Sequence, residues 1–129
     1  MVNAVLRVGV MLTAISLLVF VGIFEEASAA TDPYTYLQQF GSSGSGNGQF
    51  SNPRGLAFDS SENLYVADMS NNRIQKFDSS NTFVLKWGSS GSATSSFTNP
   101  SDVAVDSSGN VYVADPGNKR IQKFDSSGS

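Results

Sequence analysis

Two residue types are absent from the 129-residue chain, which has no cysteine and no histidine. Without cysteine the fold contains no disulfide, although small exported domains often depend on disulfides. Without histidine there is no Ser-His-Asp or Cys-His catalysis, and without either residue the usual zinc sites and RING-type zinc folds are excluded. We therefore predict that the chain is not an enzyme and has no catalytic residue, metal site or cofactor.

Charged residues are also scarce, at 15% of the chain, and neither sign dominates. If residues 1–30 are set aside, seven Lys and Arg remain against nine Asp and Glu, so the net charge is −2. Proteins that bind nucleic acid need a basic face to meet the phosphates. The composition therefore predicts no nucleic-acid partner.

Residues 1–30 have the pattern of a signal peptide. Arg7 precedes an apolar run from Val8 to Phe24, and Ala27-Ser28-Ala29 matches the small-residue cleavage pattern. The run is slightly longer than usual, so an uncleaved N-terminal membrane anchor is the alternative. Both readings place the remaining residues outside the cytoplasm, because the basic residue lies on the N-terminal side of the run. We expect a secreted protein, or one anchored with its folded part outside.

An internal repeat dominates the rest of the sequence. When the chain is shifted by 47 residues, 50–80 overlays 97–127 with 21 identities in 31 positions. Both copies contain the segment RIQKFDSS. A repeat of this length indicates a duplicated structural unit.

Each unit is predicted to form short strands separated by turns. In the first unit the apolar, β-prone segments are 55–59, 64–68, 73–78 and 82–87, and clusters of Asp, Ser, Asn and Gly separate them. The first two segments are almost wholly apolar, so we expect them to be covered on both faces. The third segment alternates imperfectly, which predicts a β-bulge. Four short strands per 40–50 residues are typical of a β-propeller blade.

The same shift aligns "TYLQQFGSSG" (35–44) with "TFVLKWGSSG" (82–91). We therefore predict that 31–49 holds the outer strand of a preceding blade, over 34–40, followed by a Gly/Ser loop. Residues 50–96 form the first repeat. Residues 97–129 form the second repeat, which lacks its fourth strand. The predicted fold class is all-β, with four-stranded antiparallel blades of an incomplete propeller of about two blades.

The segments "NPRGLAFDSSENLYVADMSNNRIQKFD" and "NPSDVAVDSSGNVYVADPGNKRIQKFD" resemble NHL repeats. The resemblance covers nearly all of the chain after residue 34. It implies a propeller of six four-stranded blades, of which this chain carries about a third. It also implies a platform that binds proteins. We therefore expect an exported, non-enzymatic scaffold for a protein or cell-envelope ligand. The alternative is a fragment of a larger propeller enzyme of the lyase or hydrolase type, or of a multi-repeat NHL protein, without independent activity.

Acidic and basic residues recur at equivalent places in the two repeats. A ring of strand-end Asp residues is one way to bind a cation in a propeller channel. Identical residues in every blade favour a structural role, in which the carboxylates accept N–H groups of the next turn and pair with arginine. We predict this role for Asp59, Asp68, Arg73, Asp106, Asp115 and Arg120.

Positions that differ between the repeats are the better candidates for ligand specificity. They lie at strand ends and turns, where propellers bind their ligands. The pairs are Arg54/Ser101, Gly55/Asp102, Glu62/Gly109, Met69/Pro116, Ser70/Gly117 and Asn72/Lys119. From these pairs we select Arg54, Glu62, Met69, Asn72, Asp102 and Lys119 as candidate binding residues.

Two blades leave two apolar faces without a neighbour, and repeat architectures need more units to bury them. One explanation is a chain taken from a longer propeller. The other is a homotrimer that completes a six-bladed ring, with the strand 34–40 of one copy beside the RIQKF strand of the next.

Overall fold

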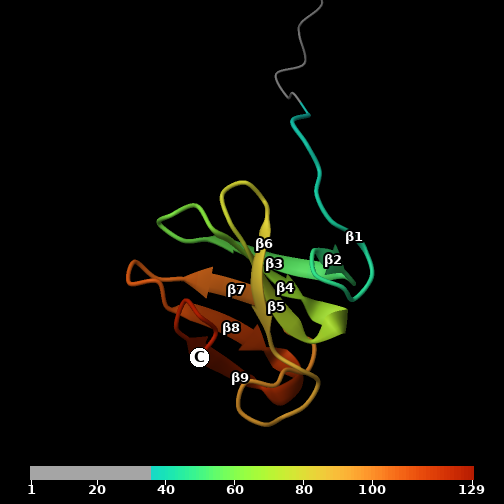
Figure 1. Ribbon diagram of the computed structural model, residues 1–129. Coiled ribbons are helices and arrows are strands. Elements are labelled where there is room, and N and C mark those ends of the chain that lie inside the picture. Colours follow the sequence, from blue (N-terminus) through green and yellow to red (C-terminus); the bar gives the residue numbers. More distant parts are fainter. Residues whose placement is uncertain (1–35) are drawn as a thin grey trace, which may run out of the picture. The chain divides into compact units, whose positions relative to one another are not determined.

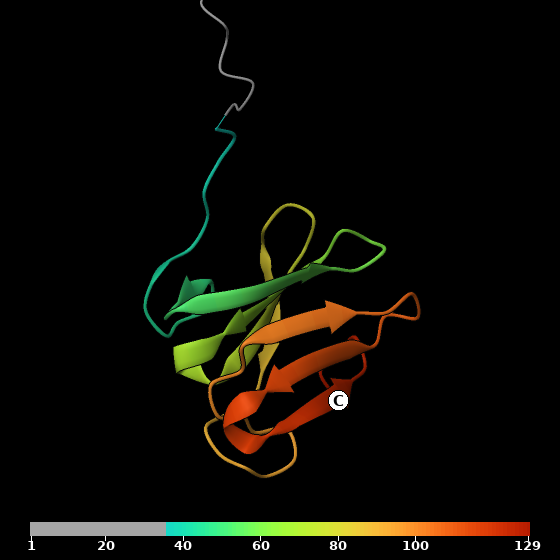
Figure 2. The same ribbon diagram turned by 180° about the vertical axis from the view of Figure 1, so that it is seen from behind.

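Antiparallel sheets form from each repeat in the computed structural model, which describes residues 36–129 (Figures 1 and 2). Residues Gln38–Ser129 make up one unit, to which the following description refers. The predicted signal segment 1–30 lies outside the described residues. The elements of the unit are strands and two single turns of 3-10 helix, which confirms the predicted all-β fold class.

The first repeat folds into a four-stranded antiparallel sheet, here called the first blade, with its strands in sequence order. One turn of 3-10 helix, η1 (Met69–Asn71), joins its second and third strands. The strands are β3 (Pro53–Phe58), β4 (Leu64–Asp68), β5 (Arg73–Phe77) and β6 (Phe83–Trp87).

The second repeat folds into a three-stranded antiparallel sheet, here called the second blade. Its last strand has a partner on one side only, whereas the equivalent β5 lies between two strands. The elements are β7 (Asp102–Val105), β8 (Val111–Asp115), η2 (Pro116–Asn118) and β9 (Arg120–Phe124).

The segment before the first blade corrects one expectation. The predicted strand 34–40 is not formed over its described part, 36–40, which belongs to no sheet. A strand needs a ladder partner, and the sheets of this single chain provide none there. The chain instead forms a short parallel pair, β1 (Ser42–Ser43) with β2 (Gln49–Phe50).

Strand registers place a bulge on the neighbouring strand β6 and not in the RIQKF strand, where it was predicted. The pairing of β5 with β6 shifts between Lys76 and Phe77, because Lys76 lies opposite Leu85 and Phe77 lies opposite Phe83. One extra residue on β6 is thus accommodated where the apolar alternation of β5 breaks.

The main core lies between the two blades and has contributions from both. Tyr65, Ala67 and Ile74 of the first blade meet apolar side chains of the second. These are Phe97, Val103, Val111, Val113 and Phe124. A second cluster lies on the other face of the first blade, where Leu64, Val66 and Phe77 pack with Phe50 and Phe83.

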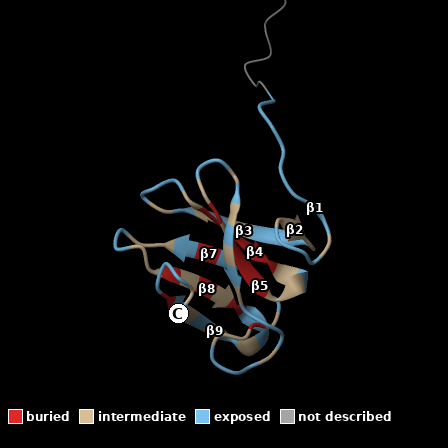
Figure 3. Ribbon diagram, in the orientation of Figure 1, coloured by how far each residue is buried: buried red, intermediate tan, exposed pale blue. Residues whose placement is uncertain are grey.

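Burial differs between the first two strands of the first blade (Figure 3). All five residues of β4 are buried, as predicted. In β3, however, Leu56 is 62% exposed and Phe58 is 65% exposed, so the expectation that both faces of this strand are covered is wrong. Side chains of the second blade cover one side of β3, and no neighbour within the described residues covers the other.

Candidate functional site

One end of the two blades gathers most of the irregular structure. Pro53 pairs with Asp68, so the start of β3 lies beside the end of β4 and the turn η1. Asp102 pairs with Ala114, which places the start of β7 beside η2 in the same way. The Gly/Ser loops, 44–48 and 91–95, are hydrogen-bonded to residues at these strand ends. We call this surface the η end.

Five of the six candidate binding residues lie at the η end. They are Arg54, Met69, Asn72, Asp102 and Lys119. The sixth, Glu62, belongs to the turn between β3 and β4, at the opposite end of the first blade. The structure therefore brings five candidates to one surface and separates Glu62 from them.

These residues differ in how they are held. Arg54, Asp102 and Lys119 are exposed, whereas Met69 and Asn72 are half-buried. The Asn72 Oδ1 accepts the backbone N–H of Asn99 at 2.8 Å and so ties the first blade to the second. Asn72 and Lys119 end the two 3-10 turns in the left-handed region, with φ of 50° and 55°.

Asp68 is the centre of a buried hydrogen-bond network beneath the η end. Its Oδ1 accepts the backbone N–H of Ser51 at 2.8 Å. Its Oδ2 accepts hydrogen bonds from Asn71 Nδ2 at 2.8 Å, Arg73 Nε at 2.7 Å and Gln75 Nε2 at 3.2 Å. The backbone donor thus belongs to the segment before β3. The sequence analysis had instead predicted a donor in the turn that follows β4. Both carboxylate oxygens have donors, as a buried charge requires.

Arg73 and Gln75 extend this network to the first Gly/Ser loop. Arg73 Nη1 donates to the carbonyl of Ser45, and Nη2 donates to the carbonyls of Gly46 and Gln49, at 2.6–2.8 Å. Gln75 accepts the N–H of Gly48 and donates to the carbonyl of Gln49. Carbonyls that a loop would otherwise direct to water are thereby fixed by a rigid guanidinium fork.

The second blade has an equivalent network, but its arginine is more exposed to solvent. Asp115 accepts hydrogen bonds from Thr98 N, Asn118 Nδ2 and Arg120 Nε at 2.8, 2.8 and 3.0 Å. Burial raises the pKa of Asp115, but these hydrogen bonds more than offset it, so the pKa is lowered from its ordinary value. The Arg120 side chain is 29% exposed, compared with 7% for Arg73. The difference arises because no neighbour in the described part of the chain covers this side.

The two glutamines of the RIQKF segments were not selected from the sequence. Gln75 is fully buried, and Gln122 holds the second Gly/Ser loop through Ser95 and Ser96. The available signal was the presence of glutamine at the same place in both repeats, within a strand that is otherwise apolar or charged.

Asp59 and Asp106 organise the turns at the opposite end. The Oδ1 of Asp106 accepts the N–H groups of Ser108 and Asn110, and its Oδ2 accepts hydrogen bonds from Asn110 Nδ2 and Tyr112 Oη. The hydrogen bond from the Asn110 side chain is the largest cause that lowers the pKa of Asp106 to about 2. Asp59 makes the equivalent bonds, and Lys76 Nζ lies 3.8 Å from its Oδ2.

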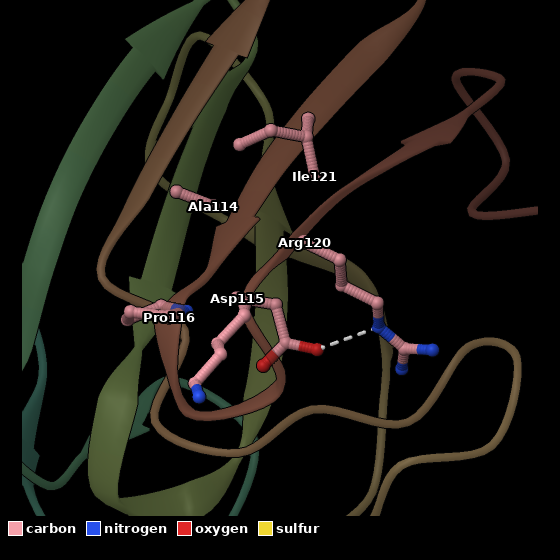
Figure 4. A pocket seen from close by; sticks show the side chains of 6 residues that line it. Ala114, Asp115, Pro116, Arg120 and Ile121 are labelled. Atoms are coloured by element: carbon pink, nitrogen blue, oxygen red, sulfur yellow. Dashed lines mark hydrogen bonds and ion pairs between the residues drawn. The ribbon is translucent and has the colours of Figure 1, made fainter.

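A shallow depression of about 380 Å³ lies on the uncovered side of the second blade (Figure 4). Ala114 and Ile121 form its apolar part, and the Asp115–Arg120 pair lies at its border. The remaining lining residues are Pro116 and Lys119. It is thus a patch on the side of the sheet, with Lys119 as its only link to the candidate binding residues.

Two further features are absent from the described part of the chain. Within 36–129 no group of three or more Asp, Glu, His or Cys residues could hold a metal ion. In the same part of the chain no helix has the length and apolarity needed to cross a membrane.

Comparisons with known proteins agree with the repeat and with its fold. Protein lin-41 of Caenorhabditis elegans is 44% identical over 45 residues, which is 35% of this chain and 4% of that protein. A crystal structure of a structural genomics protein of unknown function from Bacteroides thetaiotaomicron VPI-5482 is 23% identical, with a TM-score of 0.52. It matches 60% of this chain, which spans 22% of that protein's length, and it supports the fold alone.

The sequence model of the NHL repeat family matches this chain twice, over residues 50–77 and 97–124. Each match begins at the phenylalanine two residues before the Asn-Pro pair and ends at the phenylalanine of RIQKF. The two matched segments supply β3 to β5 and β7 to β9, the parts that the two sheets share. Residues 50–77 and 97–124 are therefore two NHL repeats, each folded as a blade of the β-propeller type.

Proposed function

We propose that this chain is an exported NHL-repeat module that binds a protein or cell-envelope ligand through its η end and has no catalytic activity. The observation that carries the proposal is the position of Arg54, Met69, Asn72, Asp102 and Lys119. These five residues come from four positions at which two otherwise similar repeats differ, and they lie on one surface. Repeats keep what the fold needs and vary at their binding face.

The loops of this surface are held in place before a ligand arrives. Arg73 fixes three carbonyls around the first Gly/Ser loop, and Arg120 fixes three around the second. A surface ordered in advance loses less conformational entropy on binding, so even small contacts contribute to affinity. The network beneath the η end thus suits a binding platform.

The chemistry of the η end suits a polar partner. Arg54 and Lys119 are exposed cations, Asp102 is an exposed carboxylate, and the neighbouring loops are rich in serine and glycine. Asp68 and Asp115 are the buried acidic residues beneath the η end. Both oxygens of each carboxylate already accept hydrogen bonds from groups of the same chain. These contacts support a structural role for the two carboxylates.

A sedimentation experiment with the cell envelope of the source organism tests the proposal. The chain carrying both Arg54→Ala and Lys119→Ala should lose most of the binding that the unmodified chain shows. Glu62→Ala, at the opposite end, is the matched control and should bind normally. The proposal fails if the double variant binds as well as the control, or if the unmodified chain does not bind. Stoichiometric, tightly bound metal in the purified protein would argue against a plain scaffold.

Export is supported by the sequence features of residues 1–30. Mass spectrometry of the chain produced in a secreting host tests this part independently. Cleavage after Ala29 and release into the medium are expected for a signal peptide, whereas an intact N-terminus in the membrane fraction indicates an anchor. An intact chain in the cytoplasm would overturn both.

We also propose that three copies assemble into a six-bladed ring. The resemblance to six-bladed NHL propellers supports this number, since each copy supplies two blades. Analytical ultracentrifugation at several concentrations tests it, with a trimer as the expected species and a monomer at all concentrations as the contrary result.

A further inference from the structure

The contact between the two blades shows what each side of a blade packs against. In the first blade, Ala67 and Ile74 are fully buried against the second blade. Their counterparts 47 residues later are Ala114 and Ile121, and Ile121 is 65% exposed. The depression of about 380 Å³ lies over these two side chains (Figure 4). The second blade therefore presents, uncovered, the side that the first blade buries.

The side of the first blade that faces away from the second blade carries the other half of the blade–blade contact. Val103 in the second blade is buried between the blades, whereas its counterpart Leu56 is largely exposed. Phe58 is exposed as well, and its counterpart Val105 packs against the core between the blades. One chain thus carries both halves of its own blade–blade contact. Such a pair of different surfaces makes a head-to-tail interface between copies.

Residues that precede the first blade are already arranged for such a contact. The ring of Trp87, at the end of β6, lies 5.7 Å from the ring of Phe124 in the next blade. Phe40 is the counterpart of Trp87, and its ring lies 5.2 Å from that of Phe77, the counterpart of Phe124. Phe40 therefore occupies, against the first blade, the place of the last residue of a preceding blade's fourth strand.

Backbone pairing extends this correspondence. Ser43 lies opposite Phe50 in a parallel pair, and Ser90 lies opposite Phe97 in the equivalent parallel bridge. The segment leading into the first blade thus follows the same path as the segment leading into the second. Within residues 36–129 no third strand lies beside residues 36–40, and one edge of the third strand β9 (Arg120–Phe124) is unpaired.

We propose that the uncovered side of the second blade and the free edge of β9 are the docking site for a second copy of this chain. Residues 36–40 of that copy add to β9 as its fourth strand, and its first blade covers Ala114 and Ile121. The pairing of β5 with β6 sets the register, so that Ile121 lies opposite Phe40 and Lys123 lies opposite Gln38 of the second copy. This inference rests on the proposed assembly of copies but not on the ring having three members.

Sequence differences between the repeats set how closely the second copy approaches. Gly55 lets β7 lie very near β3, and Asp102 stands at the equivalent place in β7. In the docked pair, the Cβ of Asp102 keeps β3 of the second copy farther from β7 than β7 lies from β3 within one chain. Apolar residues of the first blade bridge the wider gap, because Leu56, Phe58 and Leu64 are larger than their counterparts Val103, Val105 and Val111.

Cysteine cross-linking in the otherwise cysteine-free chain tests the proposed register. Residues that face each other across antiparallel strands have Cα atoms about 4.5–5.5 Å apart, within the range for a disulfide. The full chain, isolated as the host processes it, carries Gln38→Cys and Lys123→Cys and is mildly oxidised. We expect disulfide-linked chains on a non-reducing gel.

The matched control carries Gln39→Cys with Lys123→Cys, which moves one thiol to the other face of the strand. It should cross-link several-fold less. Equal yields in the two variants, or no linked chains in either, would overturn the inference. The mass of the linked species separately reports the number of copies, so a ring of another size leaves the contact itself supported.

A charge placed in the contact provides a second test. Ile121→Asp should weaken self-association by about tenfold or more, the cost of no longer burying one isoleucine. Ile121 is exposed in the single chain, so the variant should keep its β signal in circular dichroism. Ser60→Asp adds the same charge to the exposed turn after β3 and should associate normally. Unchanged association of Ile121→Asp would contradict the proposal.

Discussion

Gly55 of the first blade lies against Asp102 of the second so closely that a Cβ on Gly55 would fall 2.5 Å from the Cα of Asp102. The two residues occupy equivalent positions in the two repeats. Their difference therefore has a packing reason, because only glycine leaves room for the neighbouring strand. Asp102 remains an exposed residue of the η end.

Gly55→Ala should destabilise the contact between the blades. The added methyl group meets backbone atoms of Asp102 and Val103, which cannot turn away as a flexible side chain would. Overpacking of this kind costs about 1–3 kcal/mol. Urea denaturation measures the loss. In Gly46→Ala the nearest atoms belong to the flexible Gln49 side chain, so this control should lose less. Equal losses in the two variants would contradict the packing argument.

Arg73→Ala should be more harmful than Arg120→Ala. Both remove the partner of a buried aspartate, but Arg73 is itself buried and Arg120 is partly exposed. Breaking the buried pair should cost about 3–5 kcal/mol, and breaking the second about 1–3 kcal/mol. The free energy of unfolding in urea gives the comparison. If Arg120→Ala proves as costly as Arg73→Ala, the uncovered side of the second blade is covered in solution.

Glu62→Gly should stabilise the chain. Glu62 has φ of 62°, a left-handed conformation, and its counterpart Gly109 has φ of 81°. A residue with a Cβ is strained there by about 1–2 kcal/mol, and greater freedom of glycine in the unfolded chain offsets part of the gain. The melting temperature should rise for Glu62→Gly and fall for the reverse exchange, Gly109→Glu. A shift in the same direction for both would exclude this explanation.

Stability should decrease in acid. The pKa of Asp106 falls from 3.8 to about 2 in the folded chain, so its carboxylate stabilises the fold fully above the higher value. That contribution is lost as the pH falls through the lower one. The pKa values of Asp59, Asp115 and Asp125 are lowered as well and act in the same direction.

Thermal unfolding between pH 2 and pH 5 checks this prediction. Asp106→Asn should be less stable at neutral pH and should show a smaller decrease in melting temperature on acidification. A pH dependence that is unchanged by Asp106→Asn would show that this turn does not contribute.

The local sequence pattern was sufficient to predict the strands and turns of the two repeats. The strand Leu64–Asp68 was predicted with its observed bounds, because a short apolar run between Asp-Ser-Ser and Asn-rich turns has few other conformations. The parity of Ile74 and Phe77 predicted a bulge in β5, but the extra residue at this place lies on β6. Residues 36–40 resemble β6 in sequence but belong to no strand, since pairing depends on a partner that sequence similarity does not provide.

The candidate site, too, was predicted only in part from the sequence. The sequence identified positions that differ between the repeats, and only the registers of β3, β4, β7 and β8 showed that five of them share one end while Glu62 does not. The role of Gln75 was missed, because the loop that it holds is 26 residues away from it along the chain.

The segment RIQKF occurs twice, and by itself it determined the same third strand in both blades. Only the tertiary structure decided that Ile74 is fully buried while Ile121 is 65% exposed. The physical reason is that strand formation follows from a residue's near neighbours in sequence. Burial follows from the blade beside it, and within the described residues no blade lies on the side of the second blade that carries Ile121.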